Sequence, residues 1–120
     1  VPLVEVRRWF AARDTGRRYA RVSGDFNPIH LSNLSAKMFG FPQAIAHGMW
    51  SLAQSVAALR EHLPLANFEL DVQFRKPVRL PAELILSASA AGSSGRLQLS
   101  GRNELVHMTG GWEPLAAHSF

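Results

Sequence analysis

Apolar and polar residues alternate at intervals along the chain, in the manner of half-buried β-strands. The clearest alternation runs from Phe68 to Phe74, where every second residue is apolar and the residues between are acidic or amide-bearing. A Gly-Ser-Ser-Gly segment at residues 92–95 has the composition of a hairpin turn. The pattern also predicts strands at residues 4–7, from about residue 83 towards that turn, at residues 97–100 and at residues 105–112.

Helical signals fill the segment between the first two of these strands. Two short helices are expected, each preceded by a capping residue and followed by a glycine. They are residues 15–22, between Asp14 or Thr15 and Gly24, and residues 33–39, between Ser32 and Gly40.

The longest helical segment runs from Gly48 to His62, and Pro64 ends it. Residues 48–59 contain no charged side chain and are mostly small or apolar, so this helix is expected to be buried on all sides. An antiparallel sheet that covers such a helix must curl around it. The expected fold class is therefore α+β: a hot-dog fold, with a curved antiparallel sheet wrapped around one long central helix.

Length and composition indicate one globular domain over residues 1–120. A chain of 120 residues can form a single core, and 47% hydrophobic with 18% charged residues are globular values. No apolar run approaches the roughly 20 residues of a membrane-spanning helix, and the N-terminus lacks the apolar region of a secretory signal. The absence of cysteine fits a reducing compartment, so we expect a cytoplasmic protein with no membrane partner.

The formal net charge is +4, and the basic residues are unevenly distributed. Such a balance suits a phosphate-bearing ligand or an acidic carrier protein, and it also favours plain solubility. No zinc-finger spacing, RNA-recognition motif or run of five Lys or Arg residues is present, so no nucleic-acid partner is expected. Six of the 13 basic residues lie in the first 21 positions: Arg7, Arg8, Arg13, Arg17, Arg18 and Arg21.

The segment Gly-Asp-Phe-Asn-Pro-Ile-His has Asp25 and His30 at the two ends of a short loop. Pro28 fixes one backbone angle and favours an extended Asn27, so this loop is expected to be stiff. Asp25 is the only carboxylate in residues 15–60, and a segment so poor in charge is expected to be largely buried. Burial brings the pKa values of carboxyl groups and imidazoles towards neutrality, which suits acid–base catalysis. Two interpretations are open: an acid–base pair, or a turn-capping aspartate with a structural histidine.

The segment Ala-His-Gly-Met-Trp, residues 46–50, begins the long helix. The first N–H groups of a helix have no intrahelical partners, and the helix dipole adds positive potential there. Because Gly48 lacks a side chain, a substrate oxygen can approach its backbone closely. These features predict an oxyanion site for a carbonyl that becomes enolate-like. Gly48 as an ordinary helix cap is the alternative.

Two other chemistries are open to these residues. Asp25, His30 and His47 could form a metal triad of two histidines and one carboxylate, but no compact metal motif such as His-Glu-x-x-His is present. The chain also lacks cysteine and a Gly-x-Ser-x-Gly elbow. We therefore expect neither a metal nor a nucleophilic hydrolase. The remaining histidines are interpreted as structural or surface residues: His62, His107 and His118.

The segments YARVSGDFNPIHL, residues 19–31, and AHGMWSLA, residues 46–53, resemble the signature of the MaoC-like dehydratases. These are the (R)-specific enoyl-CoA hydratases, or hydratases 2, of hot-dog fold. The eight adjacent residues from Ser23 to His30 match the signature of that family. FRKPVRLP, residues 74–81, is similar to the family's next strand and turn, and TGGW, residues 109–112, is a weaker match.

The resemblance implies a hydro-lyase that reversibly hydrates trans-2-enoyl thioesters to (R)-3-hydroxyacyl thioesters. Asp25 and His30 would hold and activate one water, and Asn27 would support the loop or the water. Gly48 would donate its N–H to the thioester carbonyl, with His47 beside it among the substrate-binding residues. No cofactor or metal is implied beyond the CoA or acyl carrier protein that carries the substrate.

The resemblance also implies a pair of hot-dog domains that share one continuous sheet. The partner would be a second copy, in a homodimer or higher homo-oligomer, or the other half of a longer double hot-dog protein. A pantetheine arm would run along their junction. Arg75, Lys76 and Arg79 are the candidates for contact with the CoA phosphates.

Two other functions stay open: a hot-dog thioesterase, and a hot-dog that binds acyl thioesters without catalysis. Thioesterases of this fold usually carry a carboxylate on the central helix, and here that helix has none before Glu61. The complete set of Asp25, His30 and Gly48 argues against a binding module.

Overall fold

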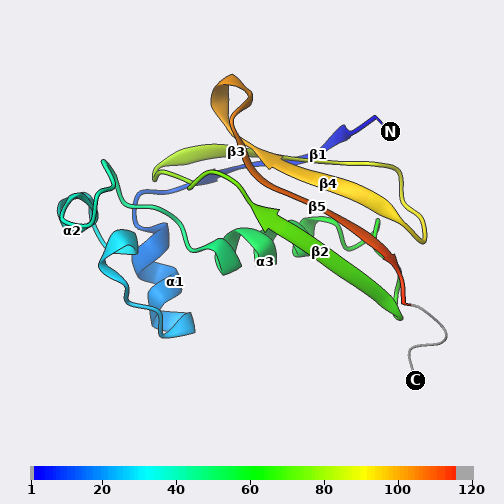
Figure 1. Cartoon of the computed structure of the whole chain (residues 1–120), viewed down its shortest axis with the longest axis horizontal. Helices are drawn as coiled ribbons and strands as arrows, with labels where there is room; N and C mark the ends of the chain where they lie inside the picture. The colour runs from blue at the N-terminus through cyan, green and yellow to red at the C-terminus, as the bar shows by residue number, and fades with distance from the viewer. Residues whose placement is uncertain (1, 116–120) are drawn as a thin grey trace.

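A computed structural model describes residues 2–115, which form a five-stranded antiparallel sheet curved over one helix (Figure 1). The edge strands of the sheet are β1 and β2, and the strand order is β1-β3-β4-β5-β2. β3 and β4 form a hairpin in which Ala88 pairs with Leu97, which confirms the turn predicted at residues 92–95. The strands are β1 (Val4–Ala11), β2 (Phe68–Phe74), β3 (Ala82–Ala88), β4 (Gly95–Ser100) and β5 (Val106–Pro114).

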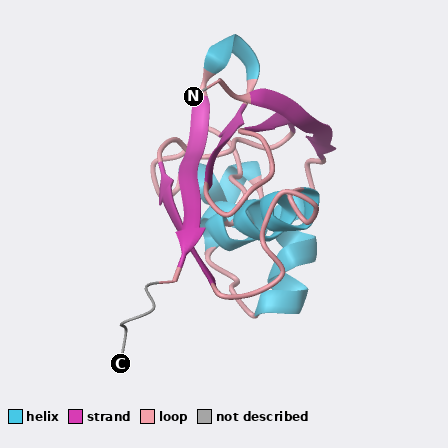
Figure 2. Ribbon diagram, turned by 90° about the vertical axis from the view of Figure 1, so that its right-hand side faces the viewer, coloured by secondary structure: helices cyan, strands magenta, loops and turns pink. Residues whose placement is uncertain are grey.

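The α-helices lie on one side of the sheet, so that they and the strands form two layers (Figure 2). In Figure 1 the sheet arches over α3. α1 and α2 lie to the left of α3 in that view. The helical elements are α1 (Thr15–Ser23), the 3-10 turn η1 (Pro28–His30), α2 (Asn33–Lys37), α3 (Gly48–Ala58) and the 3-10 turn η2 (Arg102–Glu104). No helix among residues 2–115 is both long enough and apolar enough to cross a bilayer.

Local signals explain where the short helices begin and end. Gly24 follows α1 in the left-handed conformation, with φ of 80°, as the glycine predicts. Ser32 caps α2 because its hydroxyl accepts a hydrogen bond from the Ser35 N–H at 3.1 Å. Asp14 is in the N-cap position of α1 but makes no capping hydrogen bond. Its carboxylate instead lies 3.3 Å from the guanidinium of Arg18.

The hydrophobic core lies between the sheet and α3. The strand alternation is confirmed there, because Leu84 and Leu86 of β3 and Leu97 and Leu99 of β4 are almost fully buried. Partly buried residues of α3, including Trp50, pack against this cluster. The core therefore fixes one face of α3 against the sheet, and with it the start of the helix at Gly48.

α3 differs from the prediction in its length and in its burial. It ends at Ala58, and residues 59–62 form turns in which the His62 N–H donates to the Leu59 carbonyl at 2.8 Å. The expectation of burial on all sides is wrong, because Met49 is 60% exposed while only Ser51 and Ser55 are buried within the helix. The sheet of one chain covers one face of α3 and leaves an uncharged opposite face open.

Candidate active site

The loop from Asp25 to His30 follows α1 directly and is braced by its own polar groups. The Asp25 carboxylate accepts a hydrogen bond from the Asn27 N–H at 3.1 Å. The Asn27 side chain in turn accepts one from the Ile29 N–H at 3.3 Å and caps η1, whose first residue is Pro28. The predicted stiffness of the loop thus has a structural basis, and Asn27 is part of the brace.

His30 is buried, with 8% of its surface exposed, and its ring is held in one orientation. Its Nδ1 lies 2.7 Å from the carbonyl oxygen of Ile45. Because a carbonyl oxygen can only accept, Nδ1 carries the proton and donates it. In the neutral ring Nε2 therefore bears the lone pair, and this nitrogen lies 4.0 Å from the Asp25 carboxylate.

Burial lowers the pKa of His30 from its ordinary value of 6.5. The hydrogen bond to the Ile45 carbonyl opposes this shift, His47 adds to it, and the Asp25 charge opposes it. The net direction favours the neutral ring at pH 7. The site therefore holds an imidazole that can accept a proton at Nε2.

Asp25 is more exposed than the sequence indicates. Its side chain is 55% exposed, and the neighbouring residues 21–27 are exposed as well. The expectation that this segment is largely buried is wrong, because α1 ends here and the loop lies at the molecular surface. The distance of 4.0 Å between Asp25 Oδ2 and His30 Nε2 is too long for a direct hydrogen bond. Two acceptors at this separation suit a small polar molecule that donates to both.

His47 lies directly against this pair. Its ring stacks on the ring of His30 with centroids 3.7 Å apart, and the edge contact with Tyr19 measures 4.9 Å between centroids. Its Nε2 donates to the backbone carbonyl of Asp25 at 2.9 Å. Its Nδ1 is buried and has no hydrogen-bond partner in the part of the chain that is described. His47 thus holds the Asp25 backbone in place.

One atom each from Asp25, His30 and His47 lies within 4.8 Å of the others, as a metal triad would require. The donors nevertheless fit a metal ion poorly. The planes of the two imidazoles differ by only 20°, so lone pairs that lie in those planes converge badly on one point. In addition, His47 Nε2 already donates to the Asp25 carbonyl. The arrangement suits proton transfer better than metal coordination.

A pocket of about 280 Å³ opens beside His30 at the start of α3. Gly48 lines it as the first residue of α3, and the N-cap residue His47 makes no side-chain capping bond. A Cβ at Gly48 would lie 3.2 Å from the ring of Phe74, so a glycine keeps this corner open. The free N–H groups of the first turn can therefore meet a negatively charged oxygen here.

The three basic residues predicted for carrier binding lie in different places. Arg75 lines this pocket, and its Nε donates to the Thr109 hydroxyl at 3.3 Å. Arg79 lines a second, larger hollow, and Lys76 lines both. His47 does not line the pocket, although it is adjacent in sequence to Gly48.

Two residues near the site were not recognised from the sequence. Gly16 of α1 packs so closely that a Cβ would lie within 1.9 Å of the His30 carbonyl oxygen. His107 is buried, as a structural histidine is, but it also lines the pocket. Neither belongs to the loop motif, and only the tertiary contacts reveal them. His118, also interpreted as structural or surface, lies outside the described residues.

A curved antiparallel sheet over one helix, with a loop that carries a histidine and a carboxylate beside the pocket at the start of that helix, defines a hot-dog protein with an acid–base site. The family model described as MaoC like domain matches residues 4–109. The chain belongs to the MaoC-like dehydratase family.

Individual relatives agree with this assignment. The sequence is 52% identical over 66 residues to the 3-hydroxyacyl-thioester dehydratase X of Mycobacterium tuberculosis. This match covers 55% of this chain and 23% of that protein. The crystal structure of HtdX from the same organism gives a TM-score of 0.83 at 36% identity, over 92% of this chain and 48% of that chain. The R-hydratase PhaJ1 of Pseudomonas aeruginosa gives 0.75 at 25% identity, over 96% of this chain and 81% of that chain. The chain thus spans about half of the HtdX structure. The matched segment spans 23% of the full length of dehydratase X.

Proposed function

We propose that the protein is a hydro-lyase that reversibly hydrates trans-2-enoyl thioesters to (R)-3-hydroxyacyl thioesters. The observation that carries the proposal is the juxtaposition of the His30 Nε2 lone pair, the Asp25 carboxylate 4.0 Å from it and the pocket that His30 and Gly48 line. The similarity to dehydratase X and to the R-hydratase PhaJ1 supports the same reaction.

In the hydration direction, Asp25 and His30 orient one water above the β-carbon. The water oxygen forms the new bond to that carbon while its proton passes to Nε2 of His30. The electron pair of the double bond moves towards the thioester, whose oxygen accepts hydrogen bonds from the free N–H groups at Gly48. Protonated His30 then gives this proton to the α-carbon, which restores the neutral ring and completes the 3-hydroxyacyl thioester, and the thioester bond stays intact.

The neighbouring residues position this pair. Asn27 keeps the loop in shape through the Ile29 N–H. We assign His47 to holding the Asp25 backbone and not to substrate contact, because its Nε2 is engaged with that carbonyl. No metal or other cofactor takes part in the proposed reaction, so a chelator should leave the rate unchanged.

The protein is proposed to act as part of a pair of hot-dogs, either as a homo-oligomer or together with another half of a longer chain. The uncharged face of α3 with Met49 exposed, and the free edge of β2, support this pairing. CoA or an acyl carrier protein would carry the substrate. The absence of cysteine supports a cytoplasmic location.

One assay separates the three candidate functions. A short trans-2-enoyl-CoA is offered, and the loss of the conjugated thioester absorbance is followed beside the release of free thiol. Absorbance loss without thiol release is expected of the hydratase. Thiol release would instead identify a thioesterase, and no change in either signal a binding module.

The same assay tests the assigned residues. Asp25→Asn and His30→Ala should each lower the rate by roughly 10²–10⁴-fold, which is the usual contribution of general acid–base catalysis. Near-normal activity in either variant would remove that residue from the mechanism.

A further inference from the structure

Ser51 is a buried polar residue of α3 that the reaction described above does not use. It is 4% exposed, and it lines the active-site pocket together with His30 and Gly48. Among residues 2–115, no group forms a hydrogen bond with its hydroxyl. The hydroxyl oxygen is also not fully enclosed by protein, in contrast to His47 Nδ1, so it meets the space of the pocket. A free hydroxyl in an otherwise buried residue indicates a ligand group that completes its hydrogen bonding.

Ser55 shows that a free hydroxyl is not a general property of serine on α3. Ser55 lies one turn further along and is 1% exposed, and its hydroxyl donates to the Ser51 carbonyl at 2.9 Å. This is the usual bond from a serine within a helix to the carbonyl four residues earlier. The Ser51 hydroxyl makes no such bond, and the His47 carbonyl accepts from the Ser51 N–H at 3.2 Å. The two serines therefore differ in what their hydroxyls are free to bind.

Helix geometry directs the Ser51 side chain towards Gly48. Residues three positions apart lie on the same face of a helix, one turn from each other. Side chains of a helix also lean towards its N-terminus, over the preceding turn. Gly48 has no side chain to fill that turn, and both residues line the same pocket. The Ser51 hydroxyl and the free N–H groups of the first turn therefore face the same part of the pocket.

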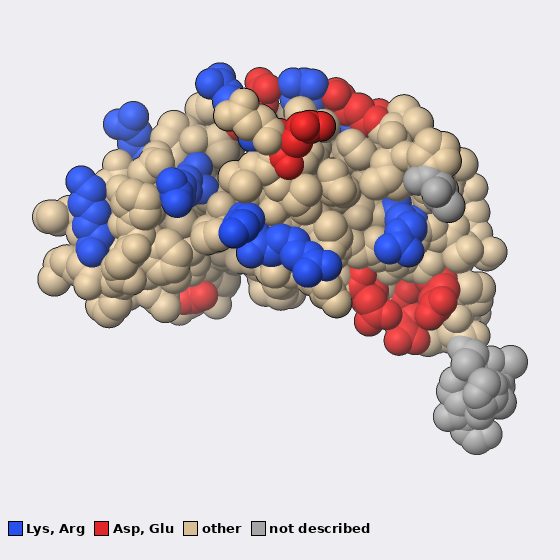
Figure 3. All heavy atoms as spheres, turned by 45° about the horizontal axis from the view of Figure 1, so that its top comes forward, with Lys and Arg blue, Asp and Glu red and all other residues tan. Residues whose placement is uncertain are grey.

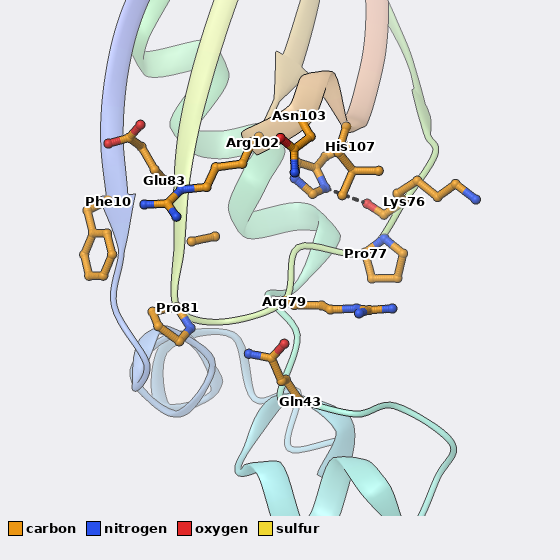
Figure 4. A pocket seen from close by; sticks show the side chains of 13 residues that line it. Phe10, Gln43, Lys76, Pro77, Arg79, Pro81, Glu83, Arg102, Asn103 and His107 are labelled. Carbon is orange, nitrogen blue, oxygen red and sulfur yellow. Dashed lines mark hydrogen bonds between the residues drawn. The ribbon is translucent and has the colours of Figure 1, made fainter.

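The other polar side chains of the pocket are less suited to this position. Arg75 and Lys76 are exposed, so their charges lie towards the mouth. Figure 3 shows Lys and Arg side chains in the same situation, on the outer surface of one face of the molecule. His107 Nδ1 donates to the Lys76 carbonyl at 3.1 Å, a bond that is dashed in Figure 4. The neutral His107 ring then offers only an acceptor at Nε2.

We propose that Ser51 is a second oxyanion donor, whose hydroxyl donates a hydrogen bond to the thioester carbonyl oxygen beside the N–H of Gly48. The inference rests on the proposed function, since that oxygen gains negative charge when water adds to the β-carbon. Hydrogen bonds to a charged acceptor are stronger than those to a neutral one, so both donors bind the transition state more tightly than the substrate. The substrate completes the hydrogen bond that the free chain leaves unmade.

Ser51→Ala removes the hydroxyl and adds no bulk. It should lower kcat for a short trans-2-enoyl-CoA roughly 10- to 100-fold, the usual effect of losing one hydrogen bond to a charged group. The KM should change little, because the bond strengthens in the transition state. The free energy of unfolding should stay equal or rise, since alanine is the better helix former and the hydroxyl has no partner to lose. An unchanged kcat would overturn the proposal.

Ser55→Ala is the matched control. It makes the same change one turn further along, at a hydroxyl that is bonded within the helix and lines neither of the two cavities. Its kcat should stay at the wild-type value, and its free energy of unfolding should decrease because a buried hydrogen bond is lost. Equal losses of kcat and of stability in the two variants would mean that Ser51 acts only through packing of α3.

A spectroscopic measurement separates the donor from the reaction. Butyryl-CoA labelled with ¹³C at the thioester carbonyl has no double bond to hydrate, and its carbonyl stretch falls in frequency when the oxygen accepts hydrogen bonds. Infrared difference spectra should show a lower frequency on the wild type and Ser55→Ala than on Ser51→Ala. If this difference is found in a protein that hydrates no thioester, the proposed function fails and the donor assignment stands. Hydration by the wild type, with the same carbonyl frequency on all three proteins, would refute Ser51 as the donor and leave the proposed function intact.

Discussion

His30 combines a buried ring with a fixed proton position. The Ile45 carbonyl holds the proton on Nδ1 at 2.7 Å, which leaves the Nε2 lone pair directed towards Asp25. His47 supports the arrangement from the other side by stacking on the ring and by binding the Asp25 carbonyl. A substitution at any of these residues changes either the acceptor itself or its orientation.

The pH dependence of activity follows from His30. Burial lowers its pKa below 6.5, so the neutral, proton-accepting ring persists at neutral pH and is lost only in more acidic solution. We expect kcat/KM for hydration to fall on the acid side with a midpoint below pH 6.5, measured by initial rates across the pH range. A midpoint clearly above pH 6.5 that His30→Gln abolishes would contradict the assigned burial effect.

The pH dependence of stability has the same sign. The unfolded chain protonates His30 near pH 6.5, whereas the folded chain resists protonation. The free energy of unfolding is therefore expected to keep its full value above pH 6.5 and to decrease as the pH falls below it. Denaturant titrations on both sides of pH 6.5 measure this, and His30→Gln should weaken the dependence.

At the level of the elements, Gly48 is the first residue of α3, where a substitution by proline can remove the backbone N–H without breaking the helix. Proline is favoured at the first position of a helix, and His47 already has the extended backbone, with ψ of 138°, that a following proline requires. Gly48→Pro should lower kcat by roughly 10²–10³-fold through the lost oxyanion donor.

Gly48→Ala is the control for Gly48→Pro, because it keeps the N–H and adds only a Cβ against the movable Phe74 ring. Its kcat should stay well above that of the proline variant. Equal losses in the two variants would mean that steric contact with Phe74, and not the N–H, makes glycine necessary.

The packing of α1 against the catalytic loop gives a second prediction. Gly16→Ala would drive a Cβ into the His30 carbonyl, so α1 and the loop must separate at a cost of roughly 1–3 kcal/mol. The free energy of unfolding and kcat should both decrease. Gly92→Ala is the matched control, since its nearest atom would be 3.7 Å away. Equal stability of the two variants would show that the close contact is unimportant.

The elements also show which features a sequence can reveal. Gly24, Ser32 and the strand alternation act over a few residues, so the end of α1, the start of α2 and the presence of the five strands could be predicted from them, whereas α2 ends two residues earlier and β1 runs four residues further than predicted. The residues Asp25, His30 and Gly48 share two short motifs, and the structure brings His30 and Gly48 to one pocket. By contrast, the early end of α3, the exposure of Asp25 and the approach of Gly16 to His30 depend on contacts between distant segments. No local pattern specifies those contacts.

The whole molecule has one apolar helix face that its own sheet does not cover. Met49 on α3 is 60% exposed, and the neighbouring residues of that face carry no charge. Among residues 2–115, no strand pairs with the outer edge of β2, and a second hot-dog domain can extend the sheet there. Burial of both features in a pair would explain why a helix without charge remains partly exposed in the single chain.

Light scattering tests this pairing. The wild type should have the mass of a dimer or higher oligomer at micromolar concentration. Met49→Glu should be a monomer, because association would bury an unpaired charge in the interface. Val22→Glu is the control, because Val22 is 84% exposed on α1. A wild type that stays monomeric at every concentration would contradict homo-oligomerisation.

In the proposed reaction, Asp25 and His30 add one water across the double bond of an enoyl thioester. Hydration in ¹⁸O-labelled water, followed by mass spectrometry of the product, shows where the water oxygen goes. We expect one labelled oxygen on the β-carbon of an intact thioester, and almost no labelled product from Asp25→Asn or His30→Ala. Label found in a free carboxylate, or labelled hydroxyacyl thioester formed at the wild-type rate by both variants, would contradict it.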